Sequence, residues 1–278
     1  YINSNIPERP LVQYKNSPDA EYLNKIHGKW VSFKVPGRTL QEGGSNRNVS
    51  LYLKDTSNDR QFVLNIPDIE GEVLKHQWEL RAWSKDYTSL VRSANGLIFF
   101  IKVDQIVNHI LISDMAQALA AFFSTTEKSL DLVGEVEFKE MSEKWVHEKT
   151  PTQVRVVEVL QFHLDMMYRG KGIPVAFVLS AWDKQLGEIL EIKPAEWLKT
   201  KLPLLSQYLE SNAESIIYEV IGISAQGSDY ENKDATDVLR AMDEPALRTK
   251  VVVGDEPVSN NITFPIKWIL EKWTEQNL

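Results

Sequence analysis

Short apolar runs alternate with longer amphipathic segments along this chain, so strands are expected to take turns with helices. Continuous apolar runs at 96–103, 173–179 and 216–223 are typical of strands that are buried on both faces of a parallel sheet. Apolar residues at helical spacing predict helices over 20–31, 105–123, 152–168 and 265–274. A further helix is expected over 194–209, because Pro194 is a favoured residue in the first turn of a helix. The order of these elements predicts an α/β fold with a mostly parallel central sheet flanked by helices.

The segment before the first of these strands has a different pattern. Residues 49–53 and 62–66 alternate between apolar and polar, and the polar run 56–59 lies between them. This arrangement predicts a β-hairpin. Residues 1–19 carry three prolines and are expected to be irregular, and 36–44 is expected to be a flexible loop.

Length and composition are those of a soluble globular protein. The chain has 278 residues, of which 43% are hydrophobic and 25% charged, and we expect one domain over 1–278. A helical, charged insertion is expected at 104–151 and a polar, acidic insertion at 226–261. The net charge of −8 argues against binding to nucleic acids or anionic membranes, and the absence of cysteine excludes disulfides. Without a signal peptide or an apolar membrane span, the sequence predicts a cytoplasmic protein.

Three short signatures follow predicted strands, and the first is Asp68-Ile69-Glu70-Gly71. A carboxylate at the end of a strand can hold Mg²⁺ through water, and Mg²⁺ bridges the β- and γ-phosphates of a nucleotide. Gly71 lets a backbone N–H approach the γ-phosphate, because no Cβ blocks the approach. The alternative is an ordinary turn, in which Asp and Gly are common.

The second signature is Ser180-Ala181-Trp182-Asp183. The Asp183 carboxylate could accept hydrogen bonds from guanine N1–H and from the exocyclic N2–H₂, a pair of donors that adenine lacks. A guanine-binding loop of this kind usually carries Asn or Thr and then Lys at the positions of Ser180 and Ala181. We hypothesise that Trp182 or Lys184 compensates for these missing side chains by packing on the base. The alternative is a solvated Asp at the end of a strand.

The third signature, Ser224-Ala225-Gln226-Gly227, is placed to bring a backbone N–H to guanine O6, although Ser-Ala pairs are common. Thr39 precedes the predicted hairpin, where its hydroxyl could ligate Mg²⁺, although threonines are abundant in loops. Glu72 follows Gly71 and could orient a water or act as a weak base. Its alternative is a solvated helix-start residue near the positive end of a helix dipole.

Taken in order, Thr39, Asp68–Gly71, Ser180–Asp183 and Ser224-Ala225 resemble the motifs of the translation-factor-like (TRAFAC) class of P-loop GTPases, and most closely the bacterial double-GTPase families. The resemblance implies GTP or GDP and Mg²⁺ as cofactors. The residues that it implies are Thr39 and Asp68 for the metal, Gly71, Asp183, Lys184, Ser224 and Ala225 for the nucleotide, and Glu72 for catalysis. It also implies a regulator in a conflict system such as antiphage defence, which switches contacts with GTPase-associated or effector proteins.

One part of the GTPase pattern is missing. A Gly-rich phosphate loop ending in Gly-Lys-Ser/Thr occurs nowhere in the 278 residues, and the strand and helix that flank it are missing too. Loss of that central strand would expose two sheet edges. We therefore expect about 30 or more residues upstream, a βαβ half-unit's worth, and GTP hydrolysis only with that segment. The alternative is a nucleotide-free pseudo-GTPase that acts as a protein-interaction scaffold.

Overall fold

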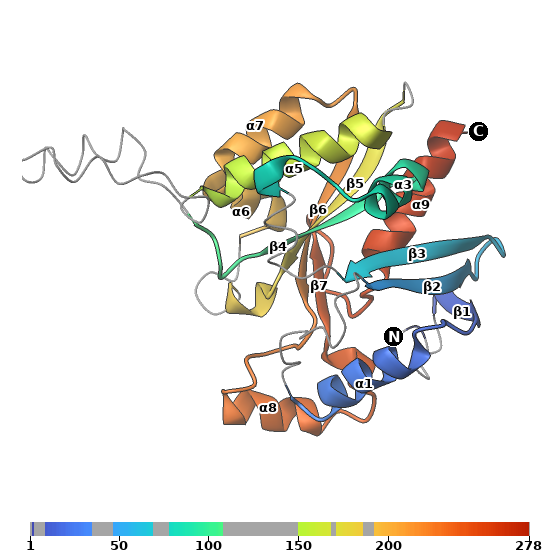
Figure 1. Ribbon diagram of the computed structural model, residues 1–278. Helices are drawn as coiled ribbons and strands as arrows, with labels where there is room; N and C mark the ends of the chain where they lie inside the picture. Colours follow the sequence, from blue (N-terminus) through green and yellow to red (C-terminus); the bar gives the residue numbers. More distant parts are fainter. Residues whose placement is uncertain are drawn as a thin grey trace, which may run out of the picture.

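The strands of the chain form two sheets in the part that the computed structural model describes, which comprises residues 2, 9–34, 47–68, 78–107, 150–167, 171–185 and 192–277 (Figure 1). The first sheet is antiparallel, in the order β1 (Leu11–Lys15), β2 (Arg47–Asp55), β3 (Gln61–Asp68). The second sheet has the order β4 (Leu97–Lys102), β5 (Ile173–Ser180), β6 (Ile216–Ser224), β7 (Lys250–Val253). The helices are α1 (Ala20–Val31), α3 (Lys85–Ser93), α5 (Thr152–Met167), α6 (Pro194–Lys201), α7 (Pro203–Ser211), α8 (Lys233–Arg240) and α9 (Phe264–Asn277), with 3₁₀ turns η3 (Trp182–Lys184) and η4 (Pro245–Arg248).

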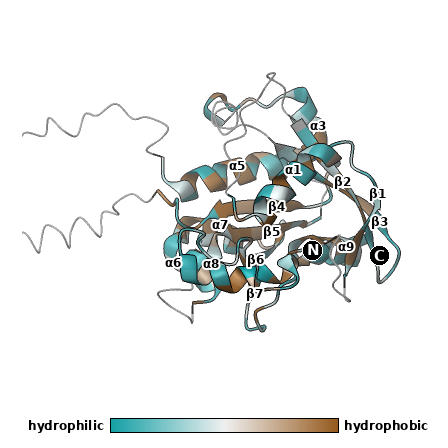
Figure 2. Cartoon of the chain, turned by 90° about the horizontal axis from the view of Figure 1, so that it is seen from below, coloured by the Kyte–Doolittle hydropathy of each residue, from teal (hydrophilic) through white to brown (hydrophobic). Residues whose placement is uncertain are grey.

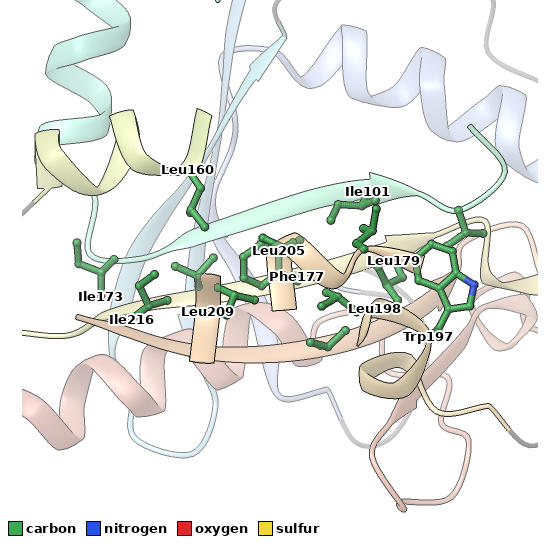
Figure 3. Packing of buried hydrophobic residues seen from close by; sticks show 14 of the residues in the cluster. Ile101, Leu160, Ile173, Phe177, Leu179, Trp197, Leu198, Leu205, Leu209 and Ile216 are labelled. Atoms are coloured by element: carbon green, nitrogen blue, oxygen red, sulfur yellow. The ribbon is translucent and has the colours of Figure 1, made fainter. Parts of the chain in front are cut away.

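The second sheet is the centre of the fold. β4, β5 and β6 are parallel and β7 is antiparallel to β6, so the predicted α/β class is confirmed with a mixed sheet. On one face Leu160 of α5 and Leu205 of α7 pack in one cluster with Phe177 of β5 (Figure 3). On the other face Trp268 of α9 packs against Val178. Figure 2 shows hydrophobic residues along these strands, with α5 on one side of them and α9 on the other.

Several predicted elements are confirmed. The helices expected over 20–31, 152–168 and 265–274 correspond to α1, α5 and α9, and the expected hairpin is formed by β2 and β3. The three apolar runs form β4, β5 and β6. Among the helices that the structure describes, none is both long and apolar enough to cross a membrane.

Two predictions were wrong in detail. The single helix expected over 194–209 is divided into α6 and α7, because Pro203 lacks a backbone N–H and begins a new helix after Leu202. The irregular segment expected over 1–19 contains β1, which pairs antiparallel with β2 from Leu11 opposite Asp55. A strand of five residues gains its order from this pairing rather than from its own pattern.

The two expected insertions differ in how much the structure describes. Residues 108–149 lie outside the described residues, while 105–107, the start of the helix expected over 105–123, are not helical. The segment 226–261 contains α8, η4 and β7, and β7 extends the central sheet beside β6. The sequence analysis identified neither α8 nor β7, because β7 has only four residues and the sequence of α8 is mostly polar.

The first sheet is joined to the C-terminal helix at the turn between β2 and β3 (Figure 1). The buried Asp55 carboxylate accepts a hydrogen bond of 2.5 Å from the Lys267 ammonium of α9. Arg60, just before the other strand, donates to Thr274, and its guanidinium carbon lies 4.6 Å from the Trp273 ring centroid. The hairpin that ends at Asp68 is therefore anchored to a helix of the central core.

Gly222 of β6 lies against the ring of Trp182, and a Cβ at this position would come within 2.7 Å of that ring. Gly222→Ala is expected to lower the free energy of unfolding by about 1–3 kcal/mol, because the strand and the buried ring must move apart. Gly28→Ala is the matched control, since a Cβ there meets nothing within 4 Å. It should raise the stability of α1 by about 0.5–1 kcal/mol. Urea denaturation of both variants checks this, and a Gly222→Ala variant as stable as the wild type would contradict it.

Candidate functional site

The loops that carry the second and third signatures begin at the carboxyl ends of neighbouring strands. β5 and β6 pair in parallel up to Ser180 opposite Ile223. Ala181 then takes a left-handed conformation, with φ of 57° and ψ of 38°, which turns the chain into η3 and leaves Asp183 partly exposed. The pairing thus brings the turn that holds Asp183 and the loop that begins with Ser224 to the same edge of the sheet.

Trp182 supports this turn from inside the core. Its side chain is 1% exposed, it packs on Gly222, and it meets the Trp197 ring edge to face at a centroid distance of 6.1 Å. The Trp182 ring therefore cannot stack on a base. The hypothesis that Trp182 replaces the missing side chains by packing on the base is not supported by this position.

Lys184 takes part in an ion pair at the edge of the site. Its ammonium lies 2.9 Å from the Asp104 carboxylate, which is also 3.4 Å from Lys102 at the end of β4. Burial alone would raise the pKa of Asp104, but the hydrogen bonds and charges of the two lysines outweigh burial and lower that pKa. Lys184 thus ties the turn after β5 to the end of β4 in this structure.

Ser224 shapes the loop after β6. Its buried hydroxyl accepts a hydrogen bond of 2.9 Å from the Gly227 N–H. Gly227 has a φ of 84°, and a Cβ there would lie 2.2 Å from the Arg248 carbonyl oxygen, so glycine is required at this turn. Ala225, between them, is exposed.

The end of α1 packs on the same loop. The Trp30 indole N–H donates to the Ala225 carbonyl at 2.9 Å, across 195 positions of sequence. Arg248 is buried and donates to the carbonyls of Val31 and Leu239, and its guanidinium lies 4.3 Å from the Phe33 ring centroid. These contacts place the end of α1 beside the candidate base-binding loop.

Two further residues of this loop, Ser228 and Tyr230, have buried hydroxyl oxygens with no hydrogen-bond partner in the structure. The Tyr230 ring meets the Phe33 ring edge to face at 5.3 Å. Burial raises the pKa of Tyr230, an effect that the Arg248 guanidinium opposes and the Asp183 carboxylate reinforces. The charges of Asp183 and Arg248 therefore both act on Tyr230. The sequence analysis found neither Arg248 nor Tyr230, because neither belongs to a recognisable motif.

Among the residues predicted to bind the metal and the phosphates or to catalyse hydrolysis, the structure describes only Asp68. Asp68 is the last residue of β3, in register with Arg47 of β2. Thr39, Gly71 and Glu72 lie outside the described residues. Elsewhere, the part of the chain that the structure describes holds no group of three or more His, Asp or Glu side chains arranged as metal ligands.

Within the described residues, β3 lies at one end of the first sheet and β4 at one end of the second, and neither pairs with a further strand. Apolar side chains are exposed on both edge strands: Phe100 of β4 is 67% exposed, and Val63 and Ile66 of β3 are 45% and 43% exposed.

The fold is that of an α/β protein with a mixed sheet, in which the candidate loops follow parallel strands and Asp68 ends a hairpin. The chain matches the family model described as Double-GTPase 1 over residues 7–269. It therefore belongs to the Double-GTPase 1 family, a membership that confirms the double-GTPase resemblance and implies guanine nucleotides and Mg²⁺ as ligands in general. No curated protein and no solved structure matches the chain.

Proposed function

We propose that this protein binds GTP or GDP with Mg²⁺ and acts as a regulatory switch. The observation that carries the proposal is the meeting of the Asp183 turn and the Ser224-Ala225 loop at the carboxyl ends of two neighbouring parallel strands. Open α/β sheets bind their ligands at this edge. Asp183 accepts hydrogen bonds from guanine N1–H and N2–H₂ in this proposal, and the Ala225 backbone N–H faces guanine O6.

The phosphate side of the proposal uses the residues at and after the end of β3. Asp68 and Thr39 would hold Mg²⁺, which neutralises phosphate charge when it is bound. Gly71 would bring its backbone N–H to the γ-phosphate, and Glu72 would orient the attacking water. Because Asp68 ends a hairpin that α9 anchors through Asp55, the metal side is supported by the central core.

The phosphate loop is proposed to lie in a segment outside the 278 residues. Its strand would pair between β3 and β4, where both edges are open and Phe100, Val63 and Ile66 are exposed. Strand addition would satisfy the backbone groups of both edges and cover these side chains. It would also bring the loop between the Asp68 end of β3 and the Asp183 turn.

The proposed output is a change of protein contacts. The γ-phosphate contacts of Thr39 and Gly71 would reorder their loops when GTP replaces GDP, and GTPase-associated or effector proteins would read the difference. Action in an antiphage defence system is part of the same proposal and is supported by the family resemblance alone.

Binding of fluorescent GTP and ATP analogues in the presence of Mg²⁺ tests the proposal. We expect the full-length protein to bind GTP selectively. The 278-residue chain should bind GTP at least about 100-fold more weakly, because the phosphate loop supplies most of the contacts with the phosphates. Absence of GTP binding by the folded full-length protein would contradict the proposal. It would favour the alternative scaffold role, with which the buried Trp182 and the paired Lys184 also agree.

A further inference from the structure

The turn after β5 is held in place on both sides of Asp183. Before Asp183, the Trp182 ring is buried against Gly222 of β6. After it, the Gln185 side chain accepts a hydrogen bond of 3.0 Å from the indole N–H of Trp197 in α6. Between these two positions the Asp183 side chain is partly exposed, and it forms no hydrogen bond or ion pair with another described residue. The turn thus presents a free carboxylate between two fixed neighbours.

Both supports involve one residue of α6, Trp197. Its indole N–H donates to Gln185, and its ring meets the Trp182 ring edge to face at a centroid distance of 6.1 Å. Trp197 is only 3% exposed and belongs to the same core cluster as Leu179 of β5 (Figure 3). A single core side chain therefore joins the residues on either side of Asp183 to the central sheet.

The turn needs this support, because its own backbone does not secure it. Ala181 has the left-handed conformation, which residues other than glycine adopt at a cost, and η3 has only three residues. The Trp197 indole N–H is removed from water and requires an acceptor, which Gln185 supplies. The hydrogen bond consequently holds the end of the turn against α6.

We infer that Trp197, acting through Trp182 and Gln185, is a positioning residue that sets the selectivity of the candidate site for guanine. A carboxylate accepts from guanine N1–H and N2–H₂ together only when its two oxygens are aligned with both donors, and a displacement of about 0.5 Å spoils such an arrangement. Support on both sides of Asp183 limits that displacement. This inference rests on the proposed function and assigns control of its base selectivity to a residue outside the three signatures.

The test compares the binding of GTP and of inosine triphosphate, each with Mg²⁺, by the Trp197→Phe and Gln185→Ala variants of the full-length protein. Inosine triphosphate keeps the N1–H of guanine but lacks its N2–H₂ group, so the ratio of the two affinities reports whether Asp183 is aligned with both donors. Each variant removes the hydrogen bond between α6 and the turn. The preference for GTP is expected to fall about fivefold, the loss typical of one hydrogen bond. The double variant should lose no more than either single variant, because both substitutions remove the same bond.

Trp78→Phe is the matched control for the loss of a buried indole. Trp78 is also buried, and its indole N–H donates to Glu158 of α5 at 2.9 Å, in a contact that involves neither the turn nor α6. This substitution removes the same groups from the core. It should leave the ratio of the GTP and inosine triphosphate affinities unchanged.

The outcomes separate this inference from the proposed function. If the wild type prefers GTP and the folded variants keep that preference, or bind both nucleotides more weakly by the same factor, the inference is overturned and the proposed function stands. Gln185→Ala, at a half-buried position, decides the test if Trp197→Phe does not fold. A wild type that binds GTP and inosine triphosphate equally well would also overturn the inference. If the wild type binds no guanine nucleotide, the proposed function fails and the inference fails with it.

Discussion

Replacing Asp183 with Asn is expected to weaken GTP binding by the full-length protein by about 100-fold. Asp183 lies in the turn after β5 and is partly exposed, so a change of one atom should leave the fold intact. A carboxylate accepts from two guanine donors in charge-assisted hydrogen bonds, each worth about 1.5–3 kcal/mol. The Asn amide keeps one acceptor and turns an N–H₂ group toward the guanine N2–H₂, so that two donors face each other. Competition titration of GTP against a fluorescent analogue measures the change.

A matched ligand controls for misfolding of this variant. Xanthosine triphosphate has a carbonyl at the position where guanine has its amino group, and that carbonyl can accept from the Asn amide. The Asp183→Asn protein should therefore prefer xanthosine triphosphate to GTP, whereas a folding defect would weaken the binding of both nucleotides. Unchanged GTP affinity would show that Asp183 does not contact the base.

The central strands could be predicted from the sequence, because strands buried on both faces consist of continuous apolar residues. All of 173–179 is buried between helices, and a continuous apolar run of that length has few other solutions in a soluble protein. The edge strands could not be predicted in this way. β1 and β7 exist because β2 and β6 offer them hydrogen-bonding partners, and that information is not local.

Some residues of the candidate site could likewise be predicted from the sequence, and others could not. Asp183 and Ser224-Ala225 could be predicted, because each follows a strand that the apolar pattern had already identified. Trp30 and Arg248 could not, because the contact of Trp30 with Ala225 joins residues 195 positions apart and the contact of Arg248 with Val31 joins residues 217 apart. Thr39, Gly71 and Glu72 stay predictions.

Lys267→Met is expected to lower the free energy of unfolding by about 3–5 kcal/mol, because it leaves the Asp55 carboxylate buried without its cation. The Asp55 side chain is only 3% exposed, and besides Lys267 it accepts hydrogen bonds from the backbone N–H and the hydroxyl of Ser57. Lys272→Met is the matched control on the same helix. Lys272 pairs with the exposed Glu275, so its loss should cost less than about 1 kcal/mol. Urea denaturation at pH 7 compares the two variants, and equal losses would contradict the prediction.

The pH dependence gives a second check on the same pair. Burial alone would raise the pKa of Asp55, but the hydrogen bonds from Lys267 and Ser57 outweigh it and hold the pKa below its usual value. A carboxyl group whose pKa is lowered by folding contributes its full stability above its unfolded pKa of about 3.9, and loses it as the pH falls through the folded pKa. The difference between wild type and Lys267→Met should therefore be largest at neutral pH and shrink as the pH falls through the Asp55 pKa of the variant, which the loss of Lys267 raises, and then through that of the wild type. A difference that stays constant down to pH 3 would mean that the Asp55 charge is not what anchors the β2–β3 hairpin, and with it Asp68, to α9.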